Sequence, residues 1–413
     1  MLNRRTAARF VEVTIVSLLL VACGGGGGGG GSSPPPSNPP QNPPPPQAPQ
    51  LPDPATAPAL RDEFAAYFRI GAAIEPEQLD VASDRGLLLK HYNNLTPENA
   101  MKADTIAPDD PSEGNPYQFE RAERIVDFAM DNGMEVHGHA LVWHQTTPEW
   151  FLARPDGMDD QTYRATIEQR LRAYVTAVVD HFEGRVEAWD VVNEVASDAP
   201  QEVYRNSQWY QAFSVGGGDG EEYIRIAFHA ARLADPDALL FINDYSTEDP
   251  AKLAKVLDIV AYIESTGEVT VDGIGHQFHL QRSSQAAHID AALTTVAETG
   301  KANRVTELDI SIYSDQGSCF VSGTGCQADY GTDFSSIPQS VVSAHARLYR
   351  ELFDVFQEHE NTLQLVTTWG VHDAHTWLNS WPVNRTNRPL LFDRDRNPKL
   401  AFWAVVDPTF TIP

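Results

Sequence analysis

Two observations predict that this 413-residue sequence folds as an α/β protein, a (β/α)8 TIM barrel. First, short apolar runs rich in β-branched and aromatic residues alternate with stretches of helical period about eight times from Ala59 to the C-terminus. Second, nearly every apolar run ends in polar or aromatic side chains, which a purely structural strand does not require. In a barrel the carboxyl ends of all strands meet at one rim, so we expect these side chains to gather there.

The predicted strands are short, as strands in globular proteins usually are. They span residues 68–74, 91–95, 136–143, 186–193, 239–244, 273–279, 304–310 and 365–370. Between them, the helical period is clearest at residues 163–181, 223–234, 251–265 and 341–359. The pattern shows no internal repeat and no transmembrane span, so we expect residues 59–413 to form one domain.

The N-terminus predicts export. Arg4, Arg5 and Arg9 precede an apolar stretch at residues 11–22, which is the order of a signal peptide, and the stretch is too short to span a bilayer permanently. It ends in the letters LVAC, which resemble the bacterial lipoprotein box and imply lipidation of Cys23 after cleavage of residues 1–22. A lipid at Cys23 would hold the protein at the cell envelope or cell surface as its one membrane contact. The alternative is an ordinary signal peptide and a secreted protein.

Residues 23–58 predict a spacer between the signal and the domain. The glycine run at residues 24–31 is typical of flexible coil, and the proline-rich stretch at residues 34–58 favours an extended, polyproline-like chain. Neither composition can build a hydrophobic core, so this segment should act as a linker.

The net charge and the cysteine content exclude some classes of partner and of scaffold. The formal net charge of −27 gives an acidic surface that repels phosphate backbones, so nucleic acid is not expected as a partner. The cysteines are too few for a disulfide scaffold. Cys319 and Cys326 lie in one loop, and oxidation outside the cell would join them in a disulfide. The alternative is two free thiols.

Two strand ends carry carboxylates. The run EAWDVVNE at residues 187–194 ends in Asn193 and Glu194, and the run RVTELDI at residues 304–310 carries Glu307 and Asp309. Two carboxylates on different strand ends can flank one bond across a cleft, which is the arrangement that glycoside hydrolysis needs. One must be protonated to release the leaving sugar and the other charged to attack, so their environments must push their pKa values apart.

The other strand ends suit a polyhydroxylated ligand, because hydroxyls need fixed donors and acceptors and sugar faces pack on aromatic rings. Each residue alone is more often a core or ion-pair residue, and only their joint occurrence on successive strands predicts a site. The residues are Glu98, Asn99, Lys102, His137, His139, Trp143, His144, Asn243, Asp244, Tyr245, His276, Gln277, His279, Trp369, His372, Asp373 and Trp377.

A series of motifs resembles the glycoside hydrolase family 10 endo-β-1,4-xylanases over residues 64–406. They are LTPENAMKAD (95–104), GHALVWH (138–144), WDVVNE (189–194), NDY (243–245), GIGHQFH (273–279), VTELD (305–309), TWGVHDAHTW (368–377) and PLLFDRDRNPKLAFWAVV (389–406). The resemblance implies a barrel enzyme without cofactor or metal. It would cut β-1,4-xylosidic bonds inside xylan or xylo-oligosaccharides with retention of configuration, and it would act as a monomer.

The same resemblance implies residue roles. Glu194 would be the general acid/base and Glu307 the nucleophile of a double displacement. Asn193 would hold the sugar 2-hydroxyl, and His279, backed by Asp309, would keep Glu307 ionised. The residues implied in substrate binding are Glu98, Asn99, Lys102, His139, Trp143, Tyr245, Gln277, Trp369 and Trp377. The sequence names no residue that raises the pKa of Glu194.

The chain departs from the family pattern at a few positions. Alanine stands at position 103, where the family usually has Trp. Gln145 and Thr146 follow the WH dipeptide, where the family commonly has Ser or Asn and then Gln. Ser246 follows the NDY motif, where the family usually has Asn. His276 and Phe278 flank Gln277 in place of the usual Met and a small residue. These differences concern substrate affinity rather than the reaction.

Three alternatives stay open. A metal-dependent barrel hydrolase could use His137, His139, His144, His276, His279 and Asp309 as ligands. A barrel that only binds xylan would keep the aromatic residues but need not keep both Glu194 and Glu307. An enzyme with the same chemistry could act on cellulose or another β-glycan, because the sequence does not reveal the pocket that admits or excludes a hydroxymethyl group.

Overall fold

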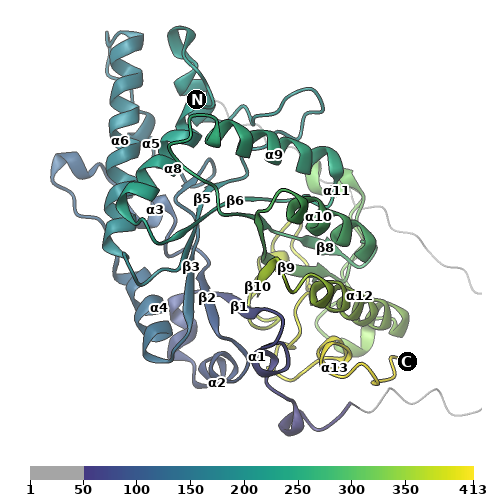
Figure 1. Ribbon diagram of the computed structural model, residues 1–413. Coiled ribbons are helices and arrows are strands. Elements are labelled where there is room, and N and C mark those ends of the chain that lie inside the picture. The colour runs from purple at the N-terminus through teal and green to yellow at the C-terminus, as the bar shows by residue number, and fades with distance from the viewer. Residues whose placement is uncertain (1–50) are drawn as a thin grey trace, which may run out of the picture. The chain divides into compact units, whose positions relative to one another are not determined.

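The computed structural model describes residues 51–413, and it shows a closed parallel barrel surrounded by helices (Figure 1). In order around the barrel, the strands are β10 (Leu363–Thr368), β1 (Arg69–Ile74), β2 (Asn94–Pro97), β3 (Glu135–Gly138), β5 (Ala188–Asn193), β6 (Leu239–Asp244), β7 (Gly273–His276) and β9 (Ala302–Ser311). Because β10 pairs in parallel with both β1 and β9, the sheet closes on itself. This confirms the predicted (β/α)8 barrel.

Helices connect successive strands and cover the outside of the barrel (Figure 1). The main connecting helices are α2 (Ala82–His91), α4 (Glu120–Asp131), α6 (Asp160–His181), α8 (Glu222–Ala234), α9 (Pro250–Glu264), α10 (Ala286–Glu298) and α12 (Gln339–Glu358), and α13 (Leu400–Val406) follows β10. Shorter helices are α1 (Leu60–Glu63), α3 (Ala103–Ile106), α5 (Glu149–Leu152), α7 (Gln208–Phe213) and α11 (Gly317–Ser322).

Local sequence explains several helix starts. The Asp159 carboxylate accepts from the backbone N–H of Thr162 and caps α6. The Ser207 hydroxyl caps α7 in the same way. Asp249 caps α9, and Pro250 occupies the first helical position, where its missing N–H costs no hydrogen bond. The four helices predicted from periodicity all lie within α6, α8, α9 and α12 or within one residue of their ends.

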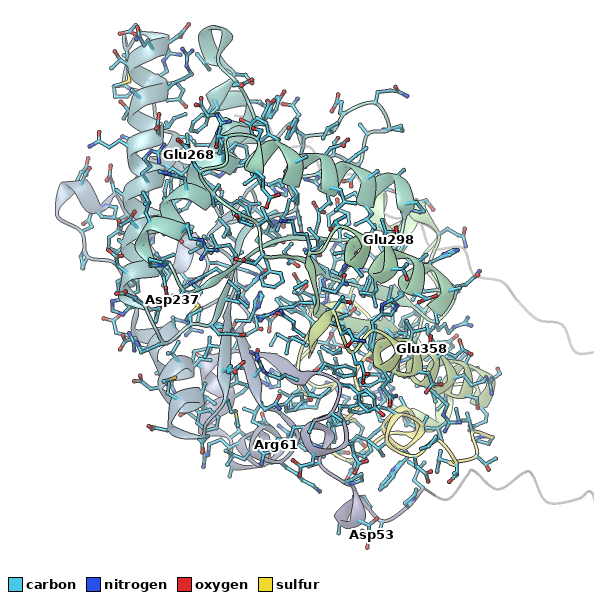
Figure 2. The ribbon with its side chains drawn as sticks, viewed as in Figure 1. Asp53, Arg61, Asp237, Glu268, Glu298 and Glu358 are labelled. Atoms are coloured by element: carbon cyan, nitrogen blue, oxygen red, sulfur yellow. A yellow bond between two sulfur atoms is a disulfide. The ribbon has the colours of Figure 1, made fainter. Side chains whose placement is uncertain are left out.

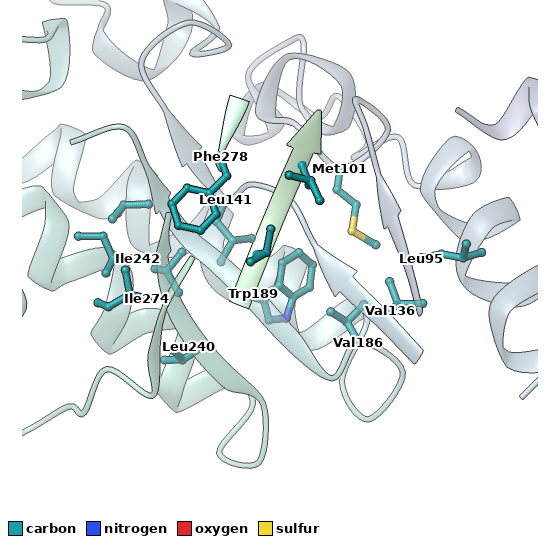
Figure 3. Close-up of a cluster of buried hydrophobic side chains, with 14 of the residues drawn as sticks. Leu95, Met101, Val136, Leu141, Val186, Trp189, Leu240, Ile242, Ile274 and Phe278 are labelled. Atoms are coloured by element: carbon teal, nitrogen blue, oxygen red, sulfur yellow. The ribbon is translucent and has the colours of Figure 1, made fainter. Parts of the chain in front are cut away.

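The barrel strands are buried on both faces, as parallel strands covered by helices usually are. Figure 3 shows part of the core, where the side chains of Val136, Trp189, Leu240 and Ile274 gather around the strands. Trp189 is fully buried and lies against the backbone of Gly138, where an added Cβ atom would stand 2.3 Å from the indole Cε3 atom. Position 138 therefore needs glycine for close packing rather than for a turn.

Acidic side chains lie on the outside of the domain. Asp237, Glu268, Glu298 and Glu358 are exposed on the outer helices and loops (Figure 2). Within the described residues, none of the helices is long and apolar enough to cross a bilayer. The predicted signal peptide, Cys23 and most of the predicted linker lie outside the described residues.

Three predicted strands differ from the structure by more than two residues at one end. The strand predicted at residues 91–95 begins later, because His91 is the last residue of α2. The strand predicted at 136–143 ends at Gly138, the next peptide bond but one (His139–Ala140) is cis, and a strand resumes as β4 (Val142–Trp143) beside β5. The strand predicted at 273–279 is broken at Phe278, whose φ is 47°, and continues as β8 (His279–Gln281) beside β9.

Gly138→Ala is expected to lower the free energy of unfolding by about 1–3 kcal/mol, because the new methyl group would overlap the buried Trp189 ring. Denaturant unfolding of the purified protein measures this change. Gly86→Ala is the matched control. Gly86 lies inside α2 with nothing within 4 Å of the added Cβ atom, so that variant should be more stable by about 0.5–1 kcal/mol. Equal stability of Gly138→Ala and the wild type would contradict the packing argument.

Candidate active site

Glu194 stands where β5 ends. Its backbone takes the left-handed conformation, with φ at 59°, which is costly for a residue with a side chain. Two hydrogen bonds hold this turn: the Glu194 N–H donates to the Asn243 carbonyl at 2.9 Å, and the Arg205 Nε donates to the Glu194 carbonyl at 2.6 Å. The side chain is largely buried, with 9% of the residue exposed. The strand end therefore fixes a buried carboxyl group at the rim of the barrel.

Glu307 lies in β9 and is 4% exposed. Its Oε1 accepts from the side-chain amide of Asn243 at 2.7 Å, and its Oε2 lies 3.1 Å from Nε2 of His279. The other ring nitrogen of His279 lies 3.1 Å from the Asp309 carboxylate. His279 thus lies between the carboxylates of Glu307 and Asp309 and contacts both.

Side-chain amides connect the two carboxyl groups. The Gln277 amide donates to Oδ1 of Asn193 at 3.0 Å and to Oε1 of Glu194 at 3.3 Å. The Asn243 amide donates to the same Asn193 oxygen at 3.1 Å and to Glu307. Asn243 also accepts a hydrogen bond from Thr306 at 2.7 Å, which fixes its amide orientation. The sequence predicts Asn243 at a strand end without a role of its own, and the NDY motif is the signal that could have indicated one.

The surroundings separate the pKa values of the two carboxyl groups. Burial raises the pKa of Glu194 above its ordinary value, and the charge on Glu307 raises it further. Burial alone would raise the pKa of Glu307 too, but His139 and His279 outweigh burial and hold that pKa below its ordinary value. Burial alone would lower the pKa of His279, yet Asp309 and Glu307 raise it to about 10. Glu194 is thus suited to carry a proton and Glu307 to carry charge.

A buried polar chain continues below Glu307 into the barrel. His139 Nδ1 lies 2.9 Å from Asp190, and Asp190 lies 2.9 Å from Nε2 of His137. The Arg304 guanidinium contacts the other nitrogen of His137 at 3.0 Å. Arginine can only donate, so Nδ1 of His137 accepts and the His137 proton resides on Nε2, facing Asp190. The two histidines hold the pKa of Asp190 below its ordinary value against the effect of burial.

Glu98, Asn99 and Lys102 form a second group after β2. The Lys102 ammonium donates to the Asn99 side chain at 2.8 Å and lies 4.7 Å from the centre of the Trp143 ring. The Asn99 amide in turn donates to Glu75 at 2.6 Å. Burial raises the pKa of Glu98 to about 7. Glu75 follows β1 and was missed by the sequence analysis, although it is a carboxylate directly after a predicted strand.

Aromatic residues lie around this rim. The Trp369 ring meets the His139 ring edge-on, with centroids 5.2 Å apart. The Trp377 indole donates to Asp309 at 2.8 Å, and its ring lies 4.8 Å from the His279 ring. Both tryptophans therefore contact the groups that surround Glu307.

Tyr245 lies beside a cluster of charges that the sequence analysis did not identify. Its hydroxyl bonds with Asp198 and accepts from Arg205 at 2.6 Å, and its ring lies 4.3 Å from the Lys252 ammonium. Arg205 also donates to the Glu194 carbonyl, so one guanidinium positions both Tyr245 and Glu194.

Four of the five histidines considered as metal ligands have hydrogen-bond or ion-pair partners in the protein instead. His276 contacts Thr247 at 2.7 Å and Asn303 at 2.9 Å inside the core, and burial lowers its pKa to about 4. His137, His139 and His279 are occupied by the carboxylates described above. In the part of the chain that the structure describes, potential ligand atoms converge in two other places, at Asp84, His372 and His375 and at Asp315, Cys319 and Cys326. Cys319 and Cys326 are joined in a disulfide.

Two wider hollows in the described domain lie away from this rim. One lies beside α5 and α6 and is lined by Trp150, Arg154 and Arg170. The other lies at the opposite mouth of the barrel, where Arg69, Glu187 and Gln364 line it. Neither gathers the polar and aromatic side chains of the strand ends, so the carboxylate rim remains the candidate active site.

A parallel barrel that buries two carboxyl groups with opposite pKa shifts at the carboxyl ends of its strands, beside amides and indoles, fits a glycoside hydrolase. Comparison with known proteins gives the family. The sequence model of Glycosyl hydrolase family 10 matches residues 59–408. The chain belongs to this family.

Relatives agree over nearly the whole domain. The chain is 41% identical over 359 residues to the thermostable celloxylanase of Thermoclostridium stercorarium, covering 84% of this chain and 87% of that protein. It is also 41% identical over 348 residues to a β-1,4-xylanase of Dictyoglomus thermophilum, covering 84% and 90%. The crystal structure of xylanase B from Clostridium stercorarium F9 superposes with a TM-score of 0.76 at 41% identity, covering 85% of this chain and 100% of that one. A similar structure at 33% identity, with a TM-score of 0.74, holds xylotriose and covers 84% and 99%.

His279→Asn is expected to raise the pKa of the Glu307 carboxyl, because the variant removes the cation whose charge and hydrogen bond favour the carboxylate. Carboxyl ¹³C titration by NMR should show Glu307 taking up its proton at higher pH than in the wild type. His288→Asn is the control, since His288 is exposed and has no contact with Glu307. An unchanged Glu307 titration in His279→Asn would contradict the electrostatic account.

Proposed function

We propose that this glycoside hydrolase is an endo-1,4-β-xylanase that acts by a retaining double displacement. The observation that carries the mechanism is the opposite shift of the two carboxyl pKa values within one amide-linked site. The xylanase names of the relatives over most of their length support the substrate. The aromatic and amide lining of the rim suits a sugar chain.

In the first step, the charged Glu307 carboxylate forms a bond to the anomeric carbon while Glu194 gives its proton to the glycosidic oxygen, and the bond between that oxygen and the anomeric carbon breaks. In the second step, the Glu194 carboxylate takes a proton from water, the water oxygen bonds to the same carbon, and Glu307 leaves as a carboxylate. Between the steps Glu307 has lost its charge, which removes one cause of the raised Glu194 pKa. Glu194 can therefore act first as an acid and then as a base.

Asn193, Gln277 and Asn243 position these groups. Gln277 and Asn243 both donate to the Asn193 carbonyl oxygen, so the Asn193 amide nitrogen is left to donate to a sugar hydroxyl. This arrangement supports the role of Asn193 toward the 2-hydroxyl. His279, with Asp309 behind it, keeps the nucleophile ionised.

Glu194→Ala and Glu307→Ala are each expected to lower kcat on xylan by about 10²–10⁴-fold or more, the range for loss of a positioned acid, base or nucleophile. The two roles separate on an aryl xyloside, whose leaving group needs no proton. On the aryl xyloside, Glu194→Ala should still release the aryl group rapidly in the first step, whereas Glu307→Ala should not. Steady-state and burst kinetics measure both, and circular dichroism confirms folding. A folded Glu307→Ala protein with near-normal activity would refute the assignment.

The preference for xylan over cellulose is tested by comparing kcat/KM on the two soluble polymers. Activity confined to cellulose would keep the mechanism and change the substrate, and binding without cleavage of either would favour a carbohydrate-binding protein. We also propose that the protein acts as a monomer, and sedimentation of the active protein at assay concentration would show a larger species if it does not.

We further propose that the protein is exported and anchored in the bacterial cell envelope by a lipid on Cys23. The support is the order of Arg4, Arg5 and Arg9, the apolar stretch at 11–22 and the LVAC sequence. Cys23→Ala should move the protein from the membrane fraction to the soluble fraction, because a lipidated cysteine can no longer form. Ser32→Ala, nearby in the linker, is the control. Unchanged fractionation of Cys23→Ala would leave secretion by an ordinary signal peptide as the better account.

A further inference from the structure

The loop between β9 and α12 contains the short helix α11 and the disulfide between Cys319 and Cys326. Its base is fastened to the loop after β10. Arg385 donates to the Asp315 carboxylate at 3.1 Å and to the Gln327 carbonyl at 3.0 Å, and its guanidinium lies 3.8 Å from the centre of the Tyr313 ring. None of these residues contacts Glu194 or Glu307, so the catalytic steps alone do not explain this fixed loop.

An aromatic stack leads from this loop toward the active site. The Phe320 ring, next to Cys319, lies 5.2 Å from the Trp381 ring. The Trp381 ring is stacked on the Trp377 ring, with centroids 4.8 Å apart and planes 19° from parallel. Trp381 is 40% exposed, so its contacts with the other two rings are a main constraint on its position. Aromatic pairs in these geometries attract each other beyond their buried area.

The stack ends on a hydrogen bond that reaches the nucleophile. The Trp377 indole donates to Oδ2 of Asp309, which also faces His279, and His279 contacts Glu307. The other Asp309 oxygen, Oδ1, is buried and has no hydrogen-bond partner among the described residues. The orientation of the Asp309 carboxylate therefore depends on what Oδ2 contacts, and Trp377 is one of its two partners.

We propose that Phe320 and Trp381 are positioning residues that hold the Trp377 indole over Asp309, and that the Cys319–Cys326 disulfide holds Phe320 in place for this purpose. The proposal rests on the proposed function, in which the aromatic residues of the rim, Trp377 among them, line the sugar site. If Trp381 or Phe320 is removed, the Trp377 ring gains freedom and its N–H leaves Asp309 for part of the time. Asp309 then orients His279 less well, and the sugar site loses part of its wall.

The first test uses Trp381→Ala and Phe320→Ala in the full chain, with Val321→Ala as the matched control. Val321 follows Phe320 on the same helix but is 89% exposed. Exchange of the Trp377 indole proton with solvent, followed by ¹⁵N NMR and assigned by its loss in Trp377→Phe, should quicken in the first two variants and stay unchanged in Val321→Ala. This readout needs no substrate, so it tests the positioning even if the proposed xylanase function fails.

The second test measures kcat/KM on a short xylo-oligosaccharide and on xylan. Loss of one aromatic pair should lower both by about 2- to 10-fold, because Trp377 acts at the cleaved sugar whatever the chain length. Reduction of the disulfide with dithiothreitol should produce the same changes in the wild type and in Val321→Ala, and no further change in Phe320→Ala. The proposal is overturned if indole exchange stays slow in Trp381→Ala. A loss of activity confined to xylan would also overturn it, since Trp381 would then bind the distant chain directly.

Discussion

The site depends on one electrostatic constraint: two carboxyl groups must share one buried rim in opposite protonation states. Burial alone would raise the pKa of both groups. The opposite directions of the Glu194 and Glu307 pKa shifts therefore come from the neighbouring side chains. Glu307 contacts the His279 imidazole and is also stabilised by the charge of His139, whereas Glu194 has the Gln277 amide and the negative charge of Glu307. The cause of the raised Glu194 pKa is burial first and the negative charge of Glu307 second, and not a residue dedicated to that effect.

The barrel supplies the geometry for this constraint where its regular strands stop. β3 ends at Gly138 and β7 ends at His276, so His139 and Gln277 are the first residues past these two strand ends. Glu194 leaves its strand through a left-handed turn. The left-handed backbone of Phe278 and of Glu194 costs conformational energy, which the surrounding closed sheet and its buried core can absorb. The polar chain from His139 to Arg304 then anchors the surroundings of Glu307 inside the barrel through buried hydrogen bonds.

Periodicity predicted the fold, because alternating strand and helix patterns depend on local chain geometry. The same strand pattern predicted that Glu194 and Glu307 would lie at one rim, because the carboxyl ends of all barrel strands share that rim. It did not predict the role of Asn243, because a side-chain amide that bridges two strands is decided by packing between residues far apart in sequence. Arg205, Glu75 and Asp190 were missed for the same reason. The break in the strand predicted at residues 136–143 was missed because the apolar run from Ala140 to Trp143 continues past it.

The central claim is that Glu307 attacks and Glu194 alternates as acid and base, and the stereochemistry of the product tests it most directly. Proton NMR during the first minutes of xylan cleavage by the wild-type protein would identify the anomer formed before mutarotation. Two displacements at the same carbon return it to its starting configuration, so the account predicts that the β-anomer appears first. If the α-anomer appeared first, a single displacement by water would be at work, and Glu307 could not be the nucleophile.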